Sequence, residues 1–316
     1  MLDYSEEFKL LAAAYEASGE VPDTLKSTLH GLMVVSGNTL LGKNEVEGLS
    51  IDGQSMQDGV KARIVVKKGA ILQNPVHLCF GVIPTEGVQR ILADFVIEEG
   101  ARAPFIAHCT FPNALKVTHL MEGTVTVGKR ARMEYIETHY HGDKGGVEVL
   151  PTMKIDVGEE GSYTSTFKLI KGAAGFVRLD YAAHLSDMAV AELYAKIYGK
   201  GTDDIQVKES IYLDGEASRG LAKSRIVVSE RAKTEVLGEI IGTGKNSRGH
   251  VDCTEIAQSN EAAASAIPRL YVVEESAKLT HEAAIGNLDR RQMQTLMARG
   301  LSEREAADVI ITGILR

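Results

Sequence analysis

A short phrase suited to a tight corner recurs along this chain at a nearly constant step. Each copy has an apolar residue, then a charged or glycine pair, then a small residue that permits a tight turn. Counted from the leading apolar residue, the steps are 31, 30, 30, 28 and 28 residues, and two further copies follow at multiples of half a step. The six regularly spaced copies are Val66–Ala70, Ile97–Ala101, Val127–Ala131, Val157–Ser162, Leu185–Ala189 and Leu213–Ala217.

Between the corners lie short runs in which apolar and polar residues alternate. Arg63–Val66, Lys154–Val157 and Arg225–Val228 are examples, and such alternation is typical of β-strands. A fixed period with one corner chemistry indicates coils that stack and bury their apolar faces on one another. The sequence therefore predicts a mainly β fold, a right-handed parallel β-helix, with short helical segments at both ends. Such a solenoid is usually a surface or scaffold rather than a pocket enzyme.

Composition and charge narrow the partners and the compartment. Hydrophobic residues make up 44% of the 316 residues, which supports a real core, and the absence of Trp makes that core aliphatic. The net charge of −8 makes nucleic acid and anionic membranes poor partners, and no run approaches the eighteen apolar residues of a membrane span. The acidic N-terminus lacks a signal-peptide pattern, and three distant cysteines do not suggest a disulfide framework. We therefore expect a cytoplasmic protein.

The ends of the chain have a helical rather than a strand period. Residues 3–18 have apolar residues on one helical face, and Pro22 is expected to open a second short helix near Leu25–Leu32. Three regions are therefore expected. They are an N-terminal helical segment over residues 1–43, a β-helix core over residues 44–287 and a C-terminal helical hairpin over residues 288–316.

The C-terminal hairpin carries its own boundary signals. Asp289 is a plausible N-cap for a first helix, and Gly300 is expected to end that helix. Ser302–Glu305 has the pattern of a capping box, which predicts the start of a last helix. We interpret the segment as a helix–glycine–helix hairpin that closes the solenoid.

Three phrases in the last part of the chain carry a resemblance to a known family. They are Gly220–Ser229, Ala277–Gly286 and Gln292–Ala306, the last followed by Ile310. They are similar, in that order, to the N-S-R-x-x-V-S strand, the A-x-L-x-H-E-A-T or S-H-G-A-T-V-G segment and the Q-x-x-Y-L-x-x-R-G hairpin of the SufB/SufD family. These are scaffold proteins of iron–sulfur cluster assembly. The match is specific over about residues 175–316, whereas further upstream only the general character of helices followed by β-repeats agrees.

The resemblance implies a metal site. In that family a cysteine precedes the A-x-L-x-H-E strand by roughly one coil, which here is Cys253, and a thiolate is a soft ligand for iron or an acceptor for sulfur. If coils stack, Cys253 could lie near His281 and Glu282 and give one sulfur, one nitrogen and one oxygen ligand. Mixed ligation of this kind suits a transient iron–sulfur cluster. Without the resemblance, each of these residues would be interpreted as an ordinary strand or core residue.

The resemblance also implies partners. In the family the C-terminal hairpin docks SufC, an ABC-type ATPase, although a terminal helix pair is also a normal cap for a solenoid. Family complexes pair SufB with SufD, so one self-sufficient chain would pair with itself as a homodimer. The residues expected to contact the ATPase are Leu296, Met297 and Leu301 as apolar anchors, Arg299 as a polar contact and Gly300 as the left-handed helix end.

Other residues are weaker candidates for a functional site. His139 and His141 would point the same way from a strand and form a workable metal pair, but no third ligand with suitable spacing is visible. The pattern favours a solvated strand end. Cys79 and Cys109 have no motif around them and are interpreted as core residues. No phosphate-binding loop is present, because Gly242–Lys245 lacks the required spacing, so we do not expect the chain to bind ATP itself.

The resulting hypothesis is a scaffold for iron–sulfur cluster assembly that is not an enzyme and whose ATPase activity resides in a partner. Two alternatives stay open. One is a β-helix carbohydrate-active enzyme, a lyase or a hydrolase, although the lack of Trp and of a secretion signal counts against it. The other is a solenoid with a purely structural, partner-binding role.

Overall fold

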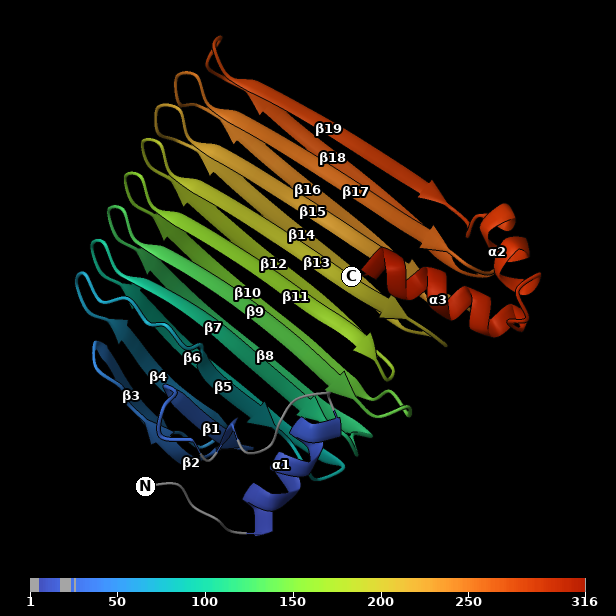
Figure 1. The fold of residues 1–316 in the computed structure, drawn as a ribbon, viewed down its shortest axis with the longest axis horizontal. Coiled ribbons are helices and arrows are strands. Elements are labelled where there is room, and N and C mark those ends of the chain that lie inside the picture. The colour runs from blue at the N-terminus through green and yellow to red at the C-terminus, as the bar shows by residue number, and fades with distance from the viewer. Residues whose placement is uncertain (1–5, 18–23, 26, 316) are drawn as a thin grey trace.

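The computed structural model describes residues 6–17, 24–25 and 27–315 and shows a parallel β-solenoid built from two facing sheets (Figure 1). Successive strands mostly alternate between a ten-stranded sheet, sheet A, and a nine-stranded sheet, sheet B. Sheet A contains β1 (Leu32–Ser36), β2 (Thr39–Asn44), β5 (Val76–Gly81), β7 (Arg102–Phe111), β9 (Arg132–His141), β11 (Ser162–Lys171), β13 (Val190–Gly199), β15 (Arg219–Val228), β17 (Arg248–Ala257) and β19 (Lys278–Gly286). Sheet B contains β3 (Leu49–Ser55), β4 (Gly59–Val66), β6 (Glu86–Ile97), β8 (Lys116–Val127), β10 (Val147–Val157), β12 (Phe176–Leu185), β14 (Asp204–Leu213), β16 (Lys233–Gly242) and β18 (Ala263–Val272). The predicted fold class is confirmed.

The recurring phrases form the corners of the coils, as their chemistry predicts. Gly69 and Gly100 have left-handed φ angles of 70°, and Arg130 holds the equivalent place with a φ of 56°. Each of these residues donates its backbone N–H to a carbonyl one coil further on, as from Gly69 to Glu99 at 3.0 Å. The corners therefore stack into a ladder of hydrogen bonds, which explains why one turn chemistry recurs at a fixed step.

The core lies between the two sheets and is continuous along the solenoid. Along each strand buried residues alternate with half-buried or exposed ones, as in the inward Met133, Tyr135 and Glu137 of β9. Parallel pairing in register places equivalent inward side chains on top of one another, so that Ala107 of β7 aligns with Glu137 of β9. An inward polar residue is therefore surrounded by the core on every side.

The N-terminal end of the solenoid is closed by antiparallel strands and a helix. β2 pairs antiparallel with β1, and β3 pairs antiparallel with β4, so the parallel stacking ends there. Helix α1 (Glu6–Ala17) lies against the outside of sheet A, where Phe8, Leu11 and Tyr15 are buried, as the helical spacing predicts. Figure 1 shows α1 beside the first strands.

Of the second short helix expected near Leu25–Leu32, the described residues show a 3₁₀ turn at Thr24 and Leu25, and residues 27–31 are not helical. Leu32 begins strand β1, whose β-branched Val34 and Val35 suit a fully buried strand, and Gly37 provides the left-handed turn into β2. Strands of the solenoid therefore begin before residue 44. Residue Pro22, which was expected to open that helix, lies outside the described residues, as does the stop expected at Ser18 and Gly19.

The C-terminal hairpin has the predicted caps but not the predicted position. The Asp289 carboxylate accepts the Arg291 N–H at 2.7 Å at the start of α2 (Arg290–Met297), and Gly300 adopts a φ of 98° after it. Ser302 and Glu305 form the reciprocal capping box that begins α3 (Glu303–Leu315). Among the described residues, no helix has the length and apolar character that a membrane crossing requires.

The expectation that this hairpin closes the solenoid is wrong. Ile311 and Leu315 of α3 pack against Val227 and its neighbours on the outer face of sheet A, so α3 runs beside the coils (Figure 1). The final strands β18 and β19, called here the open coil, keep mostly exposed or half-buried side chains. The apolar face of α3 packs on apolar side chains of the outer face of sheet A, and the described chain leaves the last coil uncovered.

Candidate functional site

Cys253 lies in β17 and points into the core. Its side chain is 2% exposed, while its strand neighbours Asp252 and Thr254 are half-buried on the outer face. β17 is the last strand of sheet A before β19, so Cys253 is one strand away from the open coil. Burial, followed by the charge of Glu255, raises the pKa of the Cys253 thiol to about 11, so the thiol keeps its proton in this buried position.

The strand that carries His281 and Glu282 pairs directly with β17, as the stacking of coils predicts. Val251 aligns with His281 and Cys253 aligns with Ala283, so His281 lies on the same face as Cys253 but two positions away along the strand. Glu282 aligns with Asp252 on the opposite, outer face. The structure therefore brings Cys253 and His281 to one face of sheet A and leaves Glu282 on the other. Both His281 and Glu282 are exposed.

Three inward polar residues accompany Cys253. Ser224 of β15 aligns with Cys253, and its hydroxyl donates a hydrogen bond of 2.6 Å to Glu255. Glu209 of β14 enters the core from sheet B and is close enough for its charge to raise the pKa of Cys253. We call Cys253, Ser224, Glu255 and Glu209 the C-terminal cluster.

Burial dominates the acid–base behaviour of this cluster. It raises the pKa of Glu209 from 4.5 to about 8 and that of Glu255 to about 7, because a carboxylate loses its hydration inside the core. Sequence analysis did not assign Glu255, Ser224 or Glu209 to the site. These residues could have been found in the sequence as polar residues at positions where the alternation of a strand predicts an inward, apolar side chain.

The outer face of the same strands is a charged surface. Asp252 accepts from Arg225 at 2.7 Å and pairs with Lys223 at 3.0 Å, and these contacts hold the pKa of Asp252 below its ordinary value. Glu282 extends this face by one strand. The two faces of β17 and β19 therefore differ in chemistry, with thiol and carboxyl groups inside and ion pairs outside.

The hairpin residues expected to bind an ATPase lie together at the surface. Met297 is 43% exposed, and Arg299 and Gly300 are also exposed, whereas Leu296 and Leu301 are half-buried. No residue of α2 is buried among those described. The segment therefore presents side chains outward and keeps its expected left-handed glycine.

The structure also corrects the interpretation of the histidine pair. His139 and His141 are 2% and 1% exposed, so they do not form a solvated strand end. They point inward from β9 because the strand continues to His141 before the chain turns. Cys79 and Cys109 are buried, as predicted for core residues, but Cys109 lies beside His139 rather than among apolar side chains alone.

Comparison with known proteins agrees with the resemblance carried by the C-terminal motifs. Residues 88–314 match the family model described as SUF system FeS cluster assembly, SufBD core domain. An iron–sulfur cluster assembly SufBD family protein of Methanocaldococcus jannaschii is 32% identical over 314 residues, covering 99% of each chain. A SufBD family protein of Pyrococcus horikoshii is 33% identical over 314 residues, covering 99% of this chain and 95% of that protein. The chain therefore belongs to the SufBD family of iron–sulfur cluster assembly proteins.

Proposed function

We propose that the chain is a scaffold on which an iron–sulfur cluster is built at the C-terminal end of the solenoid. The observation that carries the proposal is the position of Cys253, which lies on the inner face of sheet A one strand from the exposed open coil. His281 shares that face and is itself exposed. A thiolate and an imidazole suit iron, and an incomplete ligand set releases its cargo more readily than four thiolates.

The buried state of Cys253 supports a gated site. A thiol with a pKa of about 11 is a poor ligand until a cation binds or the last coil moves. Movement of β19 would expose Cys253 without disturbing earlier coils, since each coil contacts mainly its neighbours. We propose that ATP hydrolysis in a partner subunit drives this movement, so that the chain itself performs no ATPase chemistry.

Glu282 enters the proposal in a different way from the other two residues. Its carboxylate is on the outer face, so it does not share a pocket with Cys253. β19 is the edge strand of sheet A, and both of its faces can be reached from that edge. We propose Glu282 as a ligand only for a cluster that spans this edge.

A second copy of the chain is the proposed partner of the open coil. Large apolar side chains are exposed there, and they are Ile267, Tyr271, Val272, Val273 and Ile285. The edge of β19 also leaves backbone groups available for pairing. A homodimer joined at this end would cover the apolar side chains and bring two copies of Cys253 and His281 towards a shared boundary.

The proposed partner of the hairpin is an ABC-type ATPase. The exposed Met297 and the half-buried Leu296 and Leu301 supply an apolar contact, and Arg299 supplies a charge at the helix end. Arg299→Glu should weaken binding of the cognate ATPase by at least about tenfold in calorimetry, whereas the control Arg102→Glu, on exposed β7 surface, should not. Unchanged affinity for Arg299→Glu would leave the hairpin without this role.

Anaerobic reconstitution with iron and sulfide tests the site. Visible absorption and bound iron should fall in Cys253→Ser and in His281→Ala, while Cys79→Ser, a matched buried cysteine under α1, should load like the parent chain. Circular dichroism verifies that each variant is folded. Full cluster loading in Cys253→Ser would contradict the proposal. Combining Cys253→Ser with His281→Ala should cost less than the sum of the two, because ligands of one site act together.

A further inference from the structure

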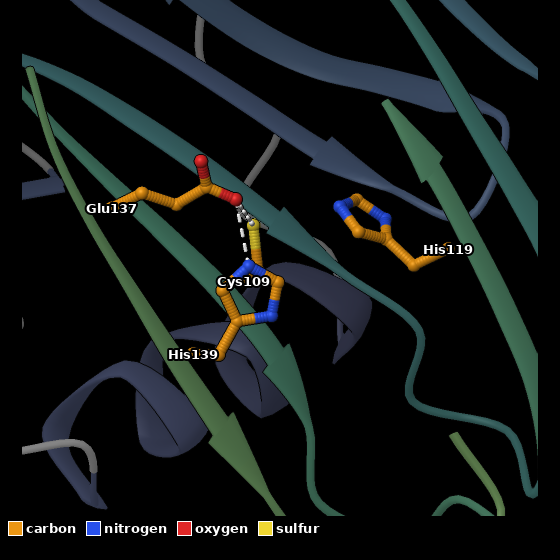
Figure 2. A group of neighbouring side chains, drawn as sticks. All are labelled: Cys109, His119, Glu137 and His139. Atoms are coloured by element: carbon orange, nitrogen blue, oxygen red, sulfur yellow. Dashed lines mark hydrogen bonds and ion pairs between the residues drawn. The ribbon is translucent and has the colours of Figure 1, made fainter. Parts of the chain in front are cut away.

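Four metal-ligating side chains meet in the core of the N-terminal half, far from Cys253. They are Cys109, His119, Glu137 and His139, called here the N-terminal cluster, and one ligand atom from each lies within 4.8 Å of the others. All four are buried, with none more than 2% exposed. Figure 2 shows Cys109, Glu137 and His139 in contact, with His119 on a separate strand facing them.

The ligands come from both walls of the solenoid. Cys109 of β7 aligns with His139 of β9, and Glu137 lies two residues before His139 on the same inward face of sheet A. His119 enters from β8 in sheet B. The alternation of the strands fixes which way each side chain points, so the cluster is a product of the fold and not of one flexible loop.

Hydrogen bonds to the two histidines of β9 leave a nitrogen lone pair directed at the cluster. His141 Nδ1 donates to the Ala173 carbonyl at 3.0 Å, so its Nε2 accepts from His139 Nδ1 at 3.4 Å. His139 Nε2 then carries a lone pair and lies 2.7 Å from the Glu137 carboxyl oxygen Oε1. Two acceptor atoms at that separation need a proton or a cation between them.

The buried ring of His119 also lacks hydrogen-bond partners for its nitrogens within the described part of the chain. Neither of its ring nitrogens has a hydrogen-bond partner among the described residues, although the side chain is fully buried. Burial lowers the pKa of His119 well below its ordinary value, so the ring is neutral and offers a lone pair. An unpartnered imidazole in a core costs free energy that a bound ion would offset.

We propose that Cys109, His119, Glu137 and His139 bind one divalent first-row transition-metal ion in the interior of the solenoid. One sulfur, two nitrogens and one oxygen form a tetrahedral donor set of the kind that Zn²⁺ takes, and Fe²⁺ accepts the same atoms. The negative charges of a thiolate and a carboxylate balance the dication, which makes the group electrically neutral in a dry core. Tetrahedral bonds place ligand atoms about 3.4–3.8 Å apart, so the cluster closes by about 1 Å on binding.

The neighbours of the cluster support the ligands. Tyr181 donates its hydroxyl to Glu137 Oε2 at 3.2 Å, which leaves Oε1 for the ion. Phe111 and Phe167 pack beside the histidine rings, with Phe167 4.8 Å from His139, and exclude water. A thiolate ligand has given up its proton, so binding of the ion displaces the thiol proton of Cys109.

Cobalt(II) is the probe for this site, because a tetrahedral Co²⁺ ion has visible d–d bands and a thiolate ligand adds a near-ultraviolet charge-transfer band. The full-length chain, reduced and freed of metal by chelation, is titrated anaerobically with Co²⁺. We expect saturation at one ion per chain and both sets of bands. Zn²⁺ and Fe²⁺ are then compared by their ability to displace the cobalt.

Variants separate this site from the one at Cys253. Cys109→Ser should lose the charge-transfer band, and His119→Leu should lower Co²⁺ affinity by at least about tenfold. Cys79→Ser and Cys253→Ser should keep the charge-transfer band and the Co²⁺ affinity of the parent chain. Co²⁺ should raise the thermal unfolding midpoint of these two controls but not that of His119→Leu. Absence of saturable d–d bands in the parent chain would overturn the proposal, as would loss of the charge-transfer band in Cys253→Ser with retention in Cys109→Ser.

Discussion

Cys109 and Cys253 both point into the solenoid from the inner face of sheet A, yet their surroundings differ. Cys109 lies on β7 with two histidines and a glutamate, whereas Cys253 lies on β17 with a serine and two glutamates. The two strands are five strand steps apart, or about 24 Å. One fold therefore holds two buried cysteines whose chemistry is set by the residues at neighbouring inward positions.

The two clusters even use the same rows of the sheet. Pairing in register places Glu137 in one row with Phe167, Ala195, Ser224 and Cys253. The adjacent inward row runs from Cys109 and His139 through Leu169, Ile197 and Ile226 to Glu255. Apolar side chains separate the polar ends of both rows. The polar positions are therefore local exceptions in an otherwise apolar core.

The ends of the solenoid explain why the clusters differ in access. The N-terminal end is closed by antiparallel strands, and several coils separate Cys109 from the open coil. Towards the C-terminal end, Cys253 is followed in the described chain by the last coil, whose side chains are largely exposed. A closed site suits an ion that stays bound, and a site near an open end suits a cargo that must leave.

The largest change in stability should come from truncating one of the apolar side chains that separate the two clusters, which are called here the apolar partition. Phe167→Ala should lower the free energy of unfolding by about 3–5 kcal/mol, because Phe167 is 1% exposed and truncation leaves a cavity. Denaturant unfolding measures it, and the exposed Val88→Ala provides a control expected to change little. A loss below about 1 kcal/mol would show that the partition is loosely packed.

Thiol labelling should separate the two cysteines next. In folded chains that keep a single cysteine, Cys253 should react at least about a hundredfold faster than Cys109, equivalent to roughly 3 kcal/mol, because opening one coil exposes it. The variants Cys79→Ser with Cys109→Ser, and Cys79→Ser with Cys253→Ser, provide the chains. Equal rates in folded protein, with equal rates in denaturant as the control, would contradict the difference in access.

The C-terminal cluster should also give the stability a pH dependence. The folded pKa of Glu209 is about 8 against an ordinary 4.5, so between these values the folded state holds a proton that the unfolded state has lost. The free energy of unfolding should therefore fall as pH rises, with Cys253 and Glu255 as the titratable neighbours inside. Glu209→Gln should remove the part of this fall that Glu209 causes, a gain on the order of 2 kcal/mol over the parent chain between pH 5 and pH 8, while the part caused by the raised pKa of Glu255 remains.

Unfolding of both chains at each pH measures the gain. Glu235→Gln, an exposed glutamate on the neighbouring strand β16, is the matched control and should show no comparable gain. An equal gain in both variants would mean that general surface charge, and not burial of Glu209, sets the slope.

The smallest effect should come from Ser224→Ala. It removes the buried 2.6 Å hydrogen bond to Glu255 and should cost about 1–2 kcal/mol. It should also raise the pKa of Glu255 further, since the Ser224 hydroxyl lowers it. A double-mutant cycle with Glu255→Gln isolates the interaction, and full additivity would show that the two side chains are not coupled.

Much of this fold was predictable because the corner phrases recur in the sequence at the length of one coil. Counting one coil of 30 residues back from His281 leads to Val251, so the proximity of β17 and β19 followed from the repeat alone. The position of α3 did not follow, because an amphipathic helix pattern gives an apolar face but not the surface that covers it.

The N-terminal cluster was only partly within reach of sequence reasoning. Cys109 precedes His139 by 30 residues, one coil, so the repeat could have supplied the third ligand that the histidine pair lacked. His119 could not be found in this way. It comes from the opposite sheet, and the facing of two sheets depends on side-chain packing that no period records.

The stacked corners fix the distance between Cys109 and Cys253. Val157 and Leu185 occupy equivalent positions in neighbouring coils, so removing residues 158–185 would delete one whole coil of 28 residues and join two matching corners. Every remaining strand would keep its register, and the two cysteines would approach by one strand spacing of about 4.8 Å. An insertion shorter than a coil would instead bulge from a corner and leave the spacing unchanged. The separation of the cysteines is thus set in whole strands, and adding or removing whole coils would change it in steps of that size.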